Sequence, residues 1–396
     1  MKYCKKCLQP DTRPNIFFND EGVCGACIYE QQKNTTIDWE SRKKELESIV
    51  KEAKERAVSS NSPYDCVIGV SGGKDSHFQA LYAKEKLGLR VLLGNGAPDG
   101  ITAVGQHNID NLCSQGFDLI SLKPNPVIAK KLAKKAFFDT GNIVAPSEYA
   151  LWSSAYIIAD KFNIPLIIQG ENAALTLGIS KNSDTSGNAL GVLNINTLSG
   201  CRADDLCEDG LGKKDLYMYD FPLSNVKEKN IVAIWLQYYA KEWSQIGNAD
   251  FAVARGLLGR MSENLHDIGR YRRFSALDSD LCIPNQMIKY YKFGFGYATD
   301  EVCYDIREGR ISREDAVWLV QEYDGKCGER YVDLVCDYLG ITKVEFRNTL
   351  DKFVNRKLFE KVKGCWIPKF TVGVDFEEDE SDIAEDMPQS VHYIKL

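Results

Sequence analysis

The chain lacks any apolar run that approaches the eighteen or so residues of a membrane-spanning helix. Its first seven residues also lack the apolar core of a secretion signal. Thirteen cysteines would suit a secreted, disulfide-bonded protein, but the length of 396 residues and the missing signal argue against that class. We therefore expect a cytoplasmic protein with no membrane span and with room for two or three domains.

The chain also has no surplus of basic residues. Its formal net charge is −7, and residues 375–386 hold eight acidic side chains and no basic one, so the rest of the chain carries +1. A nearly neutral body does not indicate a nucleic-acid-binding surface, and no nucleic-acid partner is expected. Residues 373–396 are predicted to be a solvated acidic tail, with a docking tail for a basic partner as the alternative.

The most informative stretch is Ser71-Gly72-Gly73-Lys74-Asp75-Ser76, which follows the apolar run 66–70. Glycines let a backbone approach an anion closely, and the N–H groups and dipole of a following helix attract it. A carboxylate such as Asp75 is useful beside phosphate when Mg²⁺ bridges the two. The spacing is not the Walker pattern. A plain strand-to-helix turn would explain the glycines but not the serines and the aspartate.

Four cysteines form two close pairs near the N-terminus. Cys4 and Cys7 are separated from Cys24 and Cys27 by sixteen residues, which is within the spacing of a zinc ribbon. Each pair places two thiolates on one turn, and two turns complete a tetrahedral Cys₄ site. Because four protein ligands leave no open position, we predict a structural Zn²⁺ whose binding folds this segment. The alternatives are a redox-active dithiol pair and an accidental cluster.

Apolar strands and helices alternate through the middle of the chain. Strands are expected at 66–70, 89–94, 117–122 and 165–169, and helices at 75–87, near 102–115, near 126–139 and at 147–162. This order predicts an α/β fold in which a parallel, doubly wound sheet is covered by helices on both faces. Ligands bind at the carboxyl ends of such strands. The residues to watch are therefore 71–76, Gly94-Asn95-Gly96 and Gly170-Glu171-Asn172.

The remaining boundaries follow from composition. We predict a zinc-ribbon-like module at 1–35, the α/β domain at 36–260, a helical C-terminal domain at 261–372 and the acidic tail at 373–396. Beyond Asn230 the sequence turns helical and aromatic. Residues 178–214 are rich in Gly, Ser, Asn and Asp, and are interpreted as a lid or substrate loop, with disorder as the alternative.

The Ser-Gly-Gly-x-Asp-Ser loop after a strand is identified as the pyrophosphate loop (PP-loop) of the ATP-pyrophosphatase superfamily. Further segments extend the resemblance over nearly the whole chain: 4–7, 10–14, 24–27, 70–78, 170–172, 292–295, 298–300 and 366–370. Together they resemble the N-acetyl sugar amidotransferases of bacterial lipopolysaccharide biosynthesis and flagellin glycosylation. The similarity is closest to the enzymes that make acetamidino forms of pseudaminic or legionaminic acid.

This resemblance implies an adenine nucleotide alpha hydrolase-like fold and a reaction that uses ATP and Mg²⁺. ATP activates the oxygen of an acetamido group as an adenylate, and ammonia displaces AMP to leave an acetamidine. Ser71, Gly72, Gly73, Lys74, Asp75 and Ser76 would hold the pyrophosphate, with Mg²⁺ at Asp75. By position only, Gly94 and Asn95 would flank the adenosine.

Asp75 is the first catalytic candidate, and Glu171 is the second. It would orient another Mg²⁺ or the sugar, and the alternative is a carboxylate that only stabilises a helix N-terminus. The family often carries a further acidic residue shortly after Gly-Glu-Asn, whereas Ala173-Ala174-Leu175-Thr176-Leu177 follows here. The sequence thus departs from the family pattern at this loop.

No glutaminase is encoded in the chain. Gly-x-Cys-x-Gly and His-x-Glu sequences are both absent, and Lys2 stands where an N-terminal nucleophile would need cysteine. Ammonia would therefore come from solution or from a partner. The resemblance favours a separate glutaminase similar to that of imidazole glycerol phosphate synthase.

Two further groups are left with alternatives. His77 either touches phosphate or packs, and Arg270, Arg272 and Arg273 either grip a substrate anion or cover an exposed helix face. Two rival functions are also retained. One is a tRNA thiolase of the same superfamily, and the other is a zinc-ribbon interaction protein without catalysis.

Overall fold

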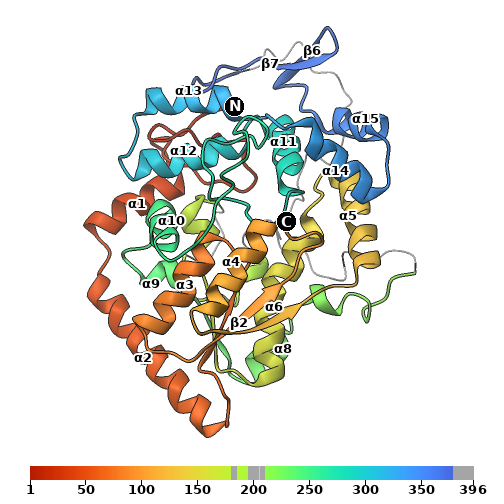
Figure 1. The fold of residues 1–396 in the computed structure, drawn as a ribbon. Helices are drawn as coiled ribbons and strands as arrows, with labels where there is room; N and C mark the ends of the chain where they lie inside the picture. The colour runs from red at the N-terminus through yellow and green to blue at the C-terminus, as the bar shows by residue number, and fades with distance from the viewer. Residues whose placement is uncertain (180–184, 195–204, 206–209, 378–396) are drawn as a thin grey trace.

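A computed structural model describes the chain except for residues 180–184, 195–204, 206–209 and 378–396 (Figure 1). Its central sheet has five parallel strands in the order β3-β2-β1-β4-β5. The strands are β1 (Cys66–Gly69), β2 (Val91–Gly96), β3 (Asp118–Leu122), β4 (Leu166–Gln169) and β5 (Val232–Trp235). The predicted α/β class with a parallel sheet is confirmed.

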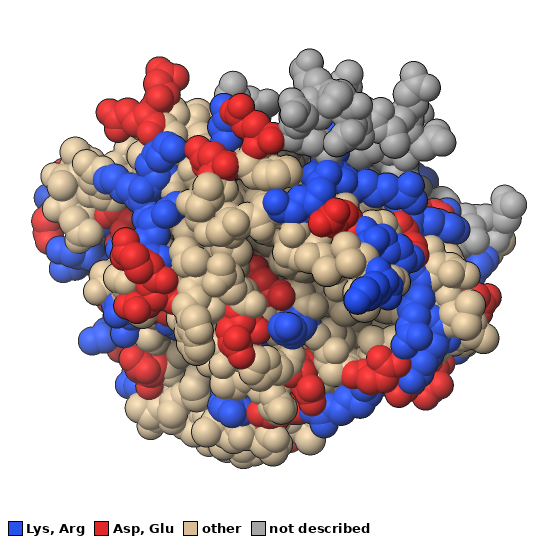
Figure 2. Space-filling view, turned by 90° about the horizontal axis from the view of Figure 1, so that it is seen from above, with Lys and Arg blue, Asp and Glu red and all other residues tan. Residues whose placement is uncertain are grey.

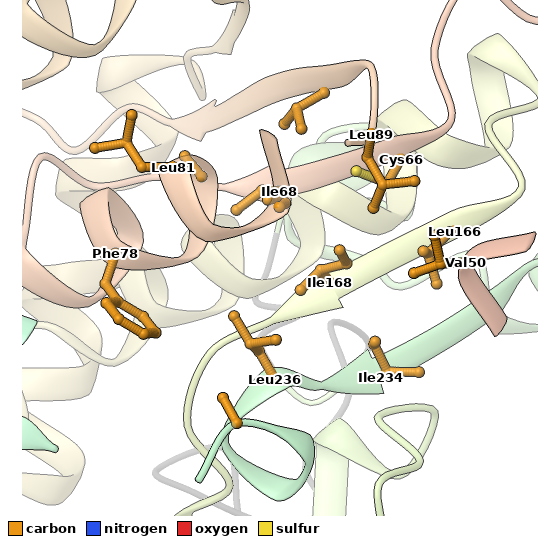
Figure 3. Close-up of a cluster of buried hydrophobic side chains, with 14 of the residues drawn as sticks. Val50, Cys66, Ile68, Phe78, Leu81, Leu89, Leu166, Ile168, Ile234 and Leu236 are labelled. Carbon is orange, nitrogen blue, oxygen red and sulfur yellow. The ribbon is translucent and has the colours of Figure 1, made fainter. Parts of the chain in front are cut away.

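Helices cover both faces of this sheet. Cys66 and Ile68 of β1 lie in one core with residues of α2 (Trp39–Ser59), α3 (Lys74–Glu85) and α4 (Ala103–Ser114), part of which Figure 3 shows. Val67, between them, lies in a second core with α5 (Pro126–Thr140), α6 (Ala145–Phe162) and α8 (Leu223–Glu228). Successive residues of a strand point to opposite faces, so the continuous apolar strands fill two cores at once.

The strand order predicts a ligand-binding crevice between β1 and β4. From β1 the chain proceeds to β2 and β3 on one side, and it later returns to β4 and β5 on the other side. The carboxyl ends of β1 and β4 are therefore neighbours where the winding reverses, which is the usual ligand position in such sheets. The segments 70–73 and 170–172 leave the sheet at this point.

Two strand expectations were wrong. β2 ends at Gly96 instead of residue 94, and Gly94 to Gly96 pair with Ile120 to Leu122. Gly94 and Gly96 lie within β2 and let α6 pack closely, since a Cβ on Gly96 would lie 2.4 Å from the Ala150 carbonyl oxygen. The chain beyond Asn230 is not all helical either, because its short apolar run forms β5.

The C-terminal part is helical, as its sequence indicates, and ends in a hairpin that was not expected. Its helices are α11 (Cys282–Phe293), α12 (Tyr297–Arg307), α13 (Arg313–Tyr323), α14 (Glu329–Leu339) and α15 (Lys343–Phe353). The hairpin joins β6 (Phe359–Val362) to β7 (Cys365–Pro368). Residues of α11, α14 and α15 share a core with Phe137 of α5, whose ring stacks on Phe346 at 5.3 Å.

The N-terminal segment packs against this C-terminal part (Figure 1). Its cysteines, and Ala26 of α1 (Gly25–Thr35), share a core with residues of α12 and α13. Met1 N donates to the Phe376 carbonyl at 2.5 Å, and Asp375 accepts a hydrogen bond from Tyr3 N at 2.8 Å. The first residues of the expected acidic tail are therefore held by the protein, while 378–396 lie outside the described residues.

Much of the predicted lid at 178–214 also lies outside the described residues, so its interpretation stays a prediction. Every helix in the described part of the chain falls short of the length and apolar character that crossing a bilayer requires.

Substitution of Gly96 tests the close contact between β2 and α6. Gly96→Ala should lower the free energy of unfolding by about 2–3 kcal/mol, because the added methyl group meets backbone that cannot rotate away. Gly191→Ala, where a Cβ meets open space, is the matched control and should change little. Urea unfolding measures both, and equal stabilities would contradict the packing.

Candidate functional site

The predicted PP-loop, residues 71–76, turns sharply between β1 and α3. Gly72 has φ +82°, and a Cβ there would lie 2.5 Å from the Gly105 carbonyl oxygen, so only glycine fits. α3 begins at Lys74 with Gly73 as its N-cap, and no side chain caps its first turn. Uncapped N–H groups at the start of a twelve-residue helix favour an anion.

His77, in the first turn of α3, contacts the backbone of this loop. Its side chain is fully buried and its Nδ1 lies 3.0 Å from the Gly73 carbonyl oxygen. Burial lowers the pKa of His77 to about 4, so the imidazole is neutral at pH 7. Asn108 donates to the Gly72 carbonyl at 3.0 Å. Of the two alternatives for His77, the structure favours packing.

The two predicted catalytic carboxyl groups belong to one hydrogen-bonded network. Lys74 Nζ donates to Asp75 Oδ2 at 2.5 Å and to Gln245 Oε1 at 2.6 Å. Gln245 Nε2 donates in turn to Glu171 Oε2 at 2.6 Å. Asn248 Nδ2 donates to the other oxygen of Asp75 at 2.8 Å. The loops that follow β1 and β4 are thus joined across the crevice.

Gln245 and Asn248 are site residues that the sequence analysis missed. Both lie on α10 (Gln245–Val253), whose i,i+3 spacing puts them on one face. α10 packs on α3, and Phe78 contacts Phe251 with ring centroids 5.2 Å apart. The sequence signal was weak: two buried amides, far from the loop in sequence, on a short apolar helix.

The network contains two carboxyl groups, those of Asp75 and Glu171, and one ammonium group, that of Lys74. Burial and the neighbouring charge of Asp75 raise the pKa of Glu171 to about 7, although Lys74 opposes the shift. A divalent cation at the two carboxyl groups would favour their ionised forms. Carboxylate and amide oxygens are the ligands that Mg²⁺ takes in proteins. Asp75 therefore fits an Mg²⁺ ion brought in with phosphate, and that charge would favour the ionised form of Glu171 beside it.

Gly94 and Asn95 have structural partners that their predicted adenosine role does not require. Asn95 is buried, and its Nδ2 donates to the Val70 carbonyl at 2.7 Å. Its Oδ1 accepts from Ser121 Oγ at 3.1 Å. Asn95 thus ties the end of β2 to both neighbouring strands. The adenosine contact stays a prediction.

The three arginines after residue 268 do not cover an exposed helix face, so that alternative was wrong. Arg270 is fully buried over the ring of Tyr297, at 4.3 Å from its centroid. Arg272 forms an ion pair with Asp305, and Arg273 Nη1 donates to the Arg260 carbonyl at 2.8 Å. These guanidinium groups hold an irregular segment together.

The four N-terminal cysteines lie together as a metal site would require. Their sulfur atoms all lie within 4.8 Å of one another and are buried. Cys4 and Cys27 are 3.9 Å apart, and Cys7 and Cys24 are 3.7 Å apart. A tetrahedron with Zn–S bonds of about 2.3 Å has S···S edges of about 3.8 Å, so the spacing fits a closed, structural Zn²⁺.

One arginine links this cluster to the crevice. Burial disfavours the charge of Arg307 on α12, but the nearby Cys7 and Cys303 outweigh burial and raise its pKa. Arg307 Nη2 donates to the Thr176 carbonyl at 3.0 Å. Thr176 ends α7 (Ala173–Thr176), the short helix that follows Glu171. The cysteine cluster and the segment that follows Glu171 therefore both contact α12.

Comparison with known proteins bears on the C-terminal part. Residues 268–371 match the family model described as LPS biosynthesis protein WbpG-like, C-terminal domain. This range contains α11 to α15 and the β6-β7 hairpin, and it falls inside the predicted 261–372 segment. The PP-loop and Glu171 lie outside it. A search of curated proteins finds no match.

The raised pKa of Glu171 predicts how stability changes with pH in the absence of metal. Folded Glu171 keeps its proton to about pH 7, whereas the unfolded chain releases it near pH 4.5, so this group makes stability fall between those values. Glu171→Gln removes that loss. The variant should gain about 2 kcal/mol over the wild type at pH 8 and nothing below pH 4.5.

Urea unfolding in chelator at a series of pH values measures the difference. Glu47→Gln, on the exposed face of α2, is the control and should follow the wild type throughout. A Glu171→Gln difference that does not vary with pH would contradict the shift.

Removal of one sulfur tests the metal site. Cys24→Ser should reduce bound zinc from one ion per chain to well below that and should destabilise the N-terminal module, since metal binding provides its folding energy. Cys365→Ser, at an exposed position of β7, should keep its zinc. Elemental analysis and thermal unfolding measure both, and wild-type protein purified without zinc would contradict the assignment.

Proposed function

We propose that this protein is an ATP-dependent amidotransferase of the PP-loop type that converts the acetamido group of an N-acetylated sugar into an acetamidino group. One observation carries the proposal: an uncapped helix N-terminus behind a glycine turn lies beside Asp75 and Glu171, at the crevice between β1 and β4. Such a place suits a polyanion with a divalent cation.

The chemistry explains why these groups are needed. An amide carbonyl is a poor electrophile and its oxygen a poor leaving group. In the proposed first step the amide oxygen attacks the α-phosphorus of ATP, and the bond to pyrophosphate breaks. The N–H groups at the start of α3 and Lys74 would stabilise the departing pyrophosphate, with Mg²⁺ held by Asp75 supplying further positive charge.

In the second step ammonia attacks the activated carbon and AMP leaves, taking the oxygen with it. Ammonia loses protons as the amidine forms, so a base is needed nearby. A carboxyl group with a pKa near 7 is suited to accept a proton at neutral pH, and we assign that role to Glu171. Gln245 would keep the Glu171 side chain directed at the crevice.

The substrate class is supported by the match of residues 268–371 to a family described by lipopolysaccharide biosynthesis. We propose an N-acetylated surface-glycan sugar of the pseudaminic or legionaminic acid type, used in the cytoplasm. Ammonia would come from a separate glutaminase, because the sequence holds no glutaminase motif.

Two rival functions make different demands. A tRNA thiolase needs a basic RNA-binding surface, whereas basic and acidic side chains are interspersed over the face seen in Figure 2. A non-catalytic zinc-ribbon protein has no need of the Asp75–Lys74–Gln245–Glu171 network.

Product analysis decides among them. The wild type given ATP, Mg²⁺, ammonium and an N-acetylated sugar should release AMP and pyrophosphate, and the sugar should lose about one mass unit as NH replaces oxygen. Asp75→Asn should lower kcat at least about 100-fold, since it removes the carboxylate that would hold the Mg²⁺ ion and thereby weakens stabilisation of the departing pyrophosphate. Asp250→Asn, at an exposed position of α10, is the matched control.

Formation of ADP instead of AMP would overturn the proposal. Stimulation by tRNA alone would select the thiolase, and full ATP turnover by Asp75→Asn would remove the catalytic assignment.

A further inference from the structure

Lys74 contacts the carboxylate to which the proposed Mg²⁺ ion would bind. Its Nζ lies 2.5 Å from Asp75 Oδ2 and 2.6 Å from Gln245 Oε1. We propose that Lys74 is a specificity-determining residue: it excludes a free divalent cation from Asp75 and admits the cation only together with a polyphosphate that binds Lys74 instead. That the polyphosphate is ATP rests on the proposed function, whereas the competition between Lys74 and the cation does not.

Both oxygens of Asp75 face hydrogen-bond donors. Lys74 Nζ donates to Oδ2, and Asn248 Nδ2 donates to Oδ1 at 2.8 Å. A divalent cation bound to Asp75 would therefore lie close to the Lys74 ammonium, and like charges at such distances repel. Asn248 is fully buried on α10, whereas Lys74 is only partly buried and carries its charge on a flexible four-carbon stem. Lys74 is therefore the group that can move away.

The position of Lys74 on α3 makes it depend on a negative partner. It is the first residue of the helix, where the dipole and the free N–H groups repel a cation. Neighbouring residues on a helix do not usually face each other, so the contact with Asp75 requires the lysine stem to fold over the first turn. Lys74 should therefore leave Asp75 only for another anion, and phosphate oxygens at the same helix terminus would be that anion.

Lys74 also fixes the amide that contacts Glu171. An ammonium group donates and cannot accept, so it selects the oxygen of Gln245 and leaves Nε2 to donate to Glu171 at 2.6 Å. The charge of Lys74 lowers the pKa of Glu171, whereas burial and Asp75 raise it. Movement of Lys74 therefore changes the surroundings of both carboxyl groups in the network.

The cation and the polyphosphate should consequently bind with positive coupling. A cation alone would leave Lys74 without its carboxylate at the start of a helix, and a polyphosphate alone would lie beside the charge of Asp75. When both arrive, the cation pairs with Asp75 and the phosphate pairs with Lys74. Because coupling between binding free energies is reciprocal, each ligand should strengthen the binding of the other by the same factor.

Mn²⁺ binding to the full-length protein without nucleotide tests the competition. Mn²⁺ takes the same oxygen ligands as Mg²⁺, and the paramagnetic resonance signal of the free ion falls as it binds. Lys74→Met keeps an apolar stem without the charge and should bind Mn²⁺ at least about tenfold tighter than the wild type, a factor within the usual range of coupling. Lys74→Arg keeps the charge and should bind Mn²⁺ as weakly as the wild type.

Two controls locate the gained site. Asp75→Asn in the Lys74→Met background should abolish the gain, because the ion has lost its carboxylate. Lys43→Met, at an exposed position of α2, should behave as the wild type, although it makes the same change in net charge. Equal Mn²⁺ affinity in the wild type and Lys74→Met would overturn the inference, and so would a gain that survives Asp75→Asn.

Pyrophosphate binding in the presence of chelator tests the exchange of partners from the other side. Asp75→Asn releases Lys74 and removes a negative charge, so calorimetry should show pyrophosphate binding at least about tenfold tighter than in the wild type. Adding Lys74→Met to this variant should remove the gain. Unchanged pyrophosphate affinity in Asp75→Asn would contradict the exchange.

Assays for AMP separate this inference from the proposed function. A Mn²⁺ site gained by Lys74→Met in a protein that makes no AMP would keep the role of Lys74 and remove the proposed function. Conversely, AMP formation by a wild type that binds Mn²⁺ as tightly as Lys74→Met would keep the function and overturn the role of Lys74.

Discussion

The arrangement around the crevice depends on one buried carboxylate, Asp300. It pairs with Arg13 from the N-terminal segment and with Lys289 from α11, and it accepts a hydrogen bond from Gln9 at 3.1 Å. Burial alone would raise the pKa of Asp300, but the two cations outweigh it and lower the pKa. The shared carboxylate therefore fixes the N-terminal segment to α11 and α12.

Helix α12 therefore joins features that the sequence presents separately. Cys303 lies in the core of the cysteine cluster, Asp300 pairs with Lys289 of α11, and Arg307 donates to the Thr176 carbonyl at the end of α7. The sheet positions the glycine turn and the uncapped start of α3, whereas the C-terminal helices form the segment that matches the family model.

What the sequence predicted was mostly local. The glycine turn at 71–76 could be predicted because the strand, the glycines and the first helical turn are consecutive, and the cysteine cluster could be predicted because metal ligands have characteristic spacings. The place of Gly96 within β2 was not predicted, because glycine is needed there for the close packing of α6. No local sequence pattern encodes that contact. Gln245 joins the network only through packing of α10 on α3, and Asp300 joins Arg13 only through packing of the N-terminal segment on α12. Contacts of that kind require the tertiary structure.

The charge state of Glu171 links the network to a cation at Asp75. Burial and the neighbouring charge of Asp75 raise the pKa of Glu171 to about 7, so this group is nearer neutrality than it would be in water. A divalent cation held at Asp75 would lower that pKa and favour the carboxylate form. Occupancy of Asp75 and protonation of Glu171 are therefore coupled through the same network.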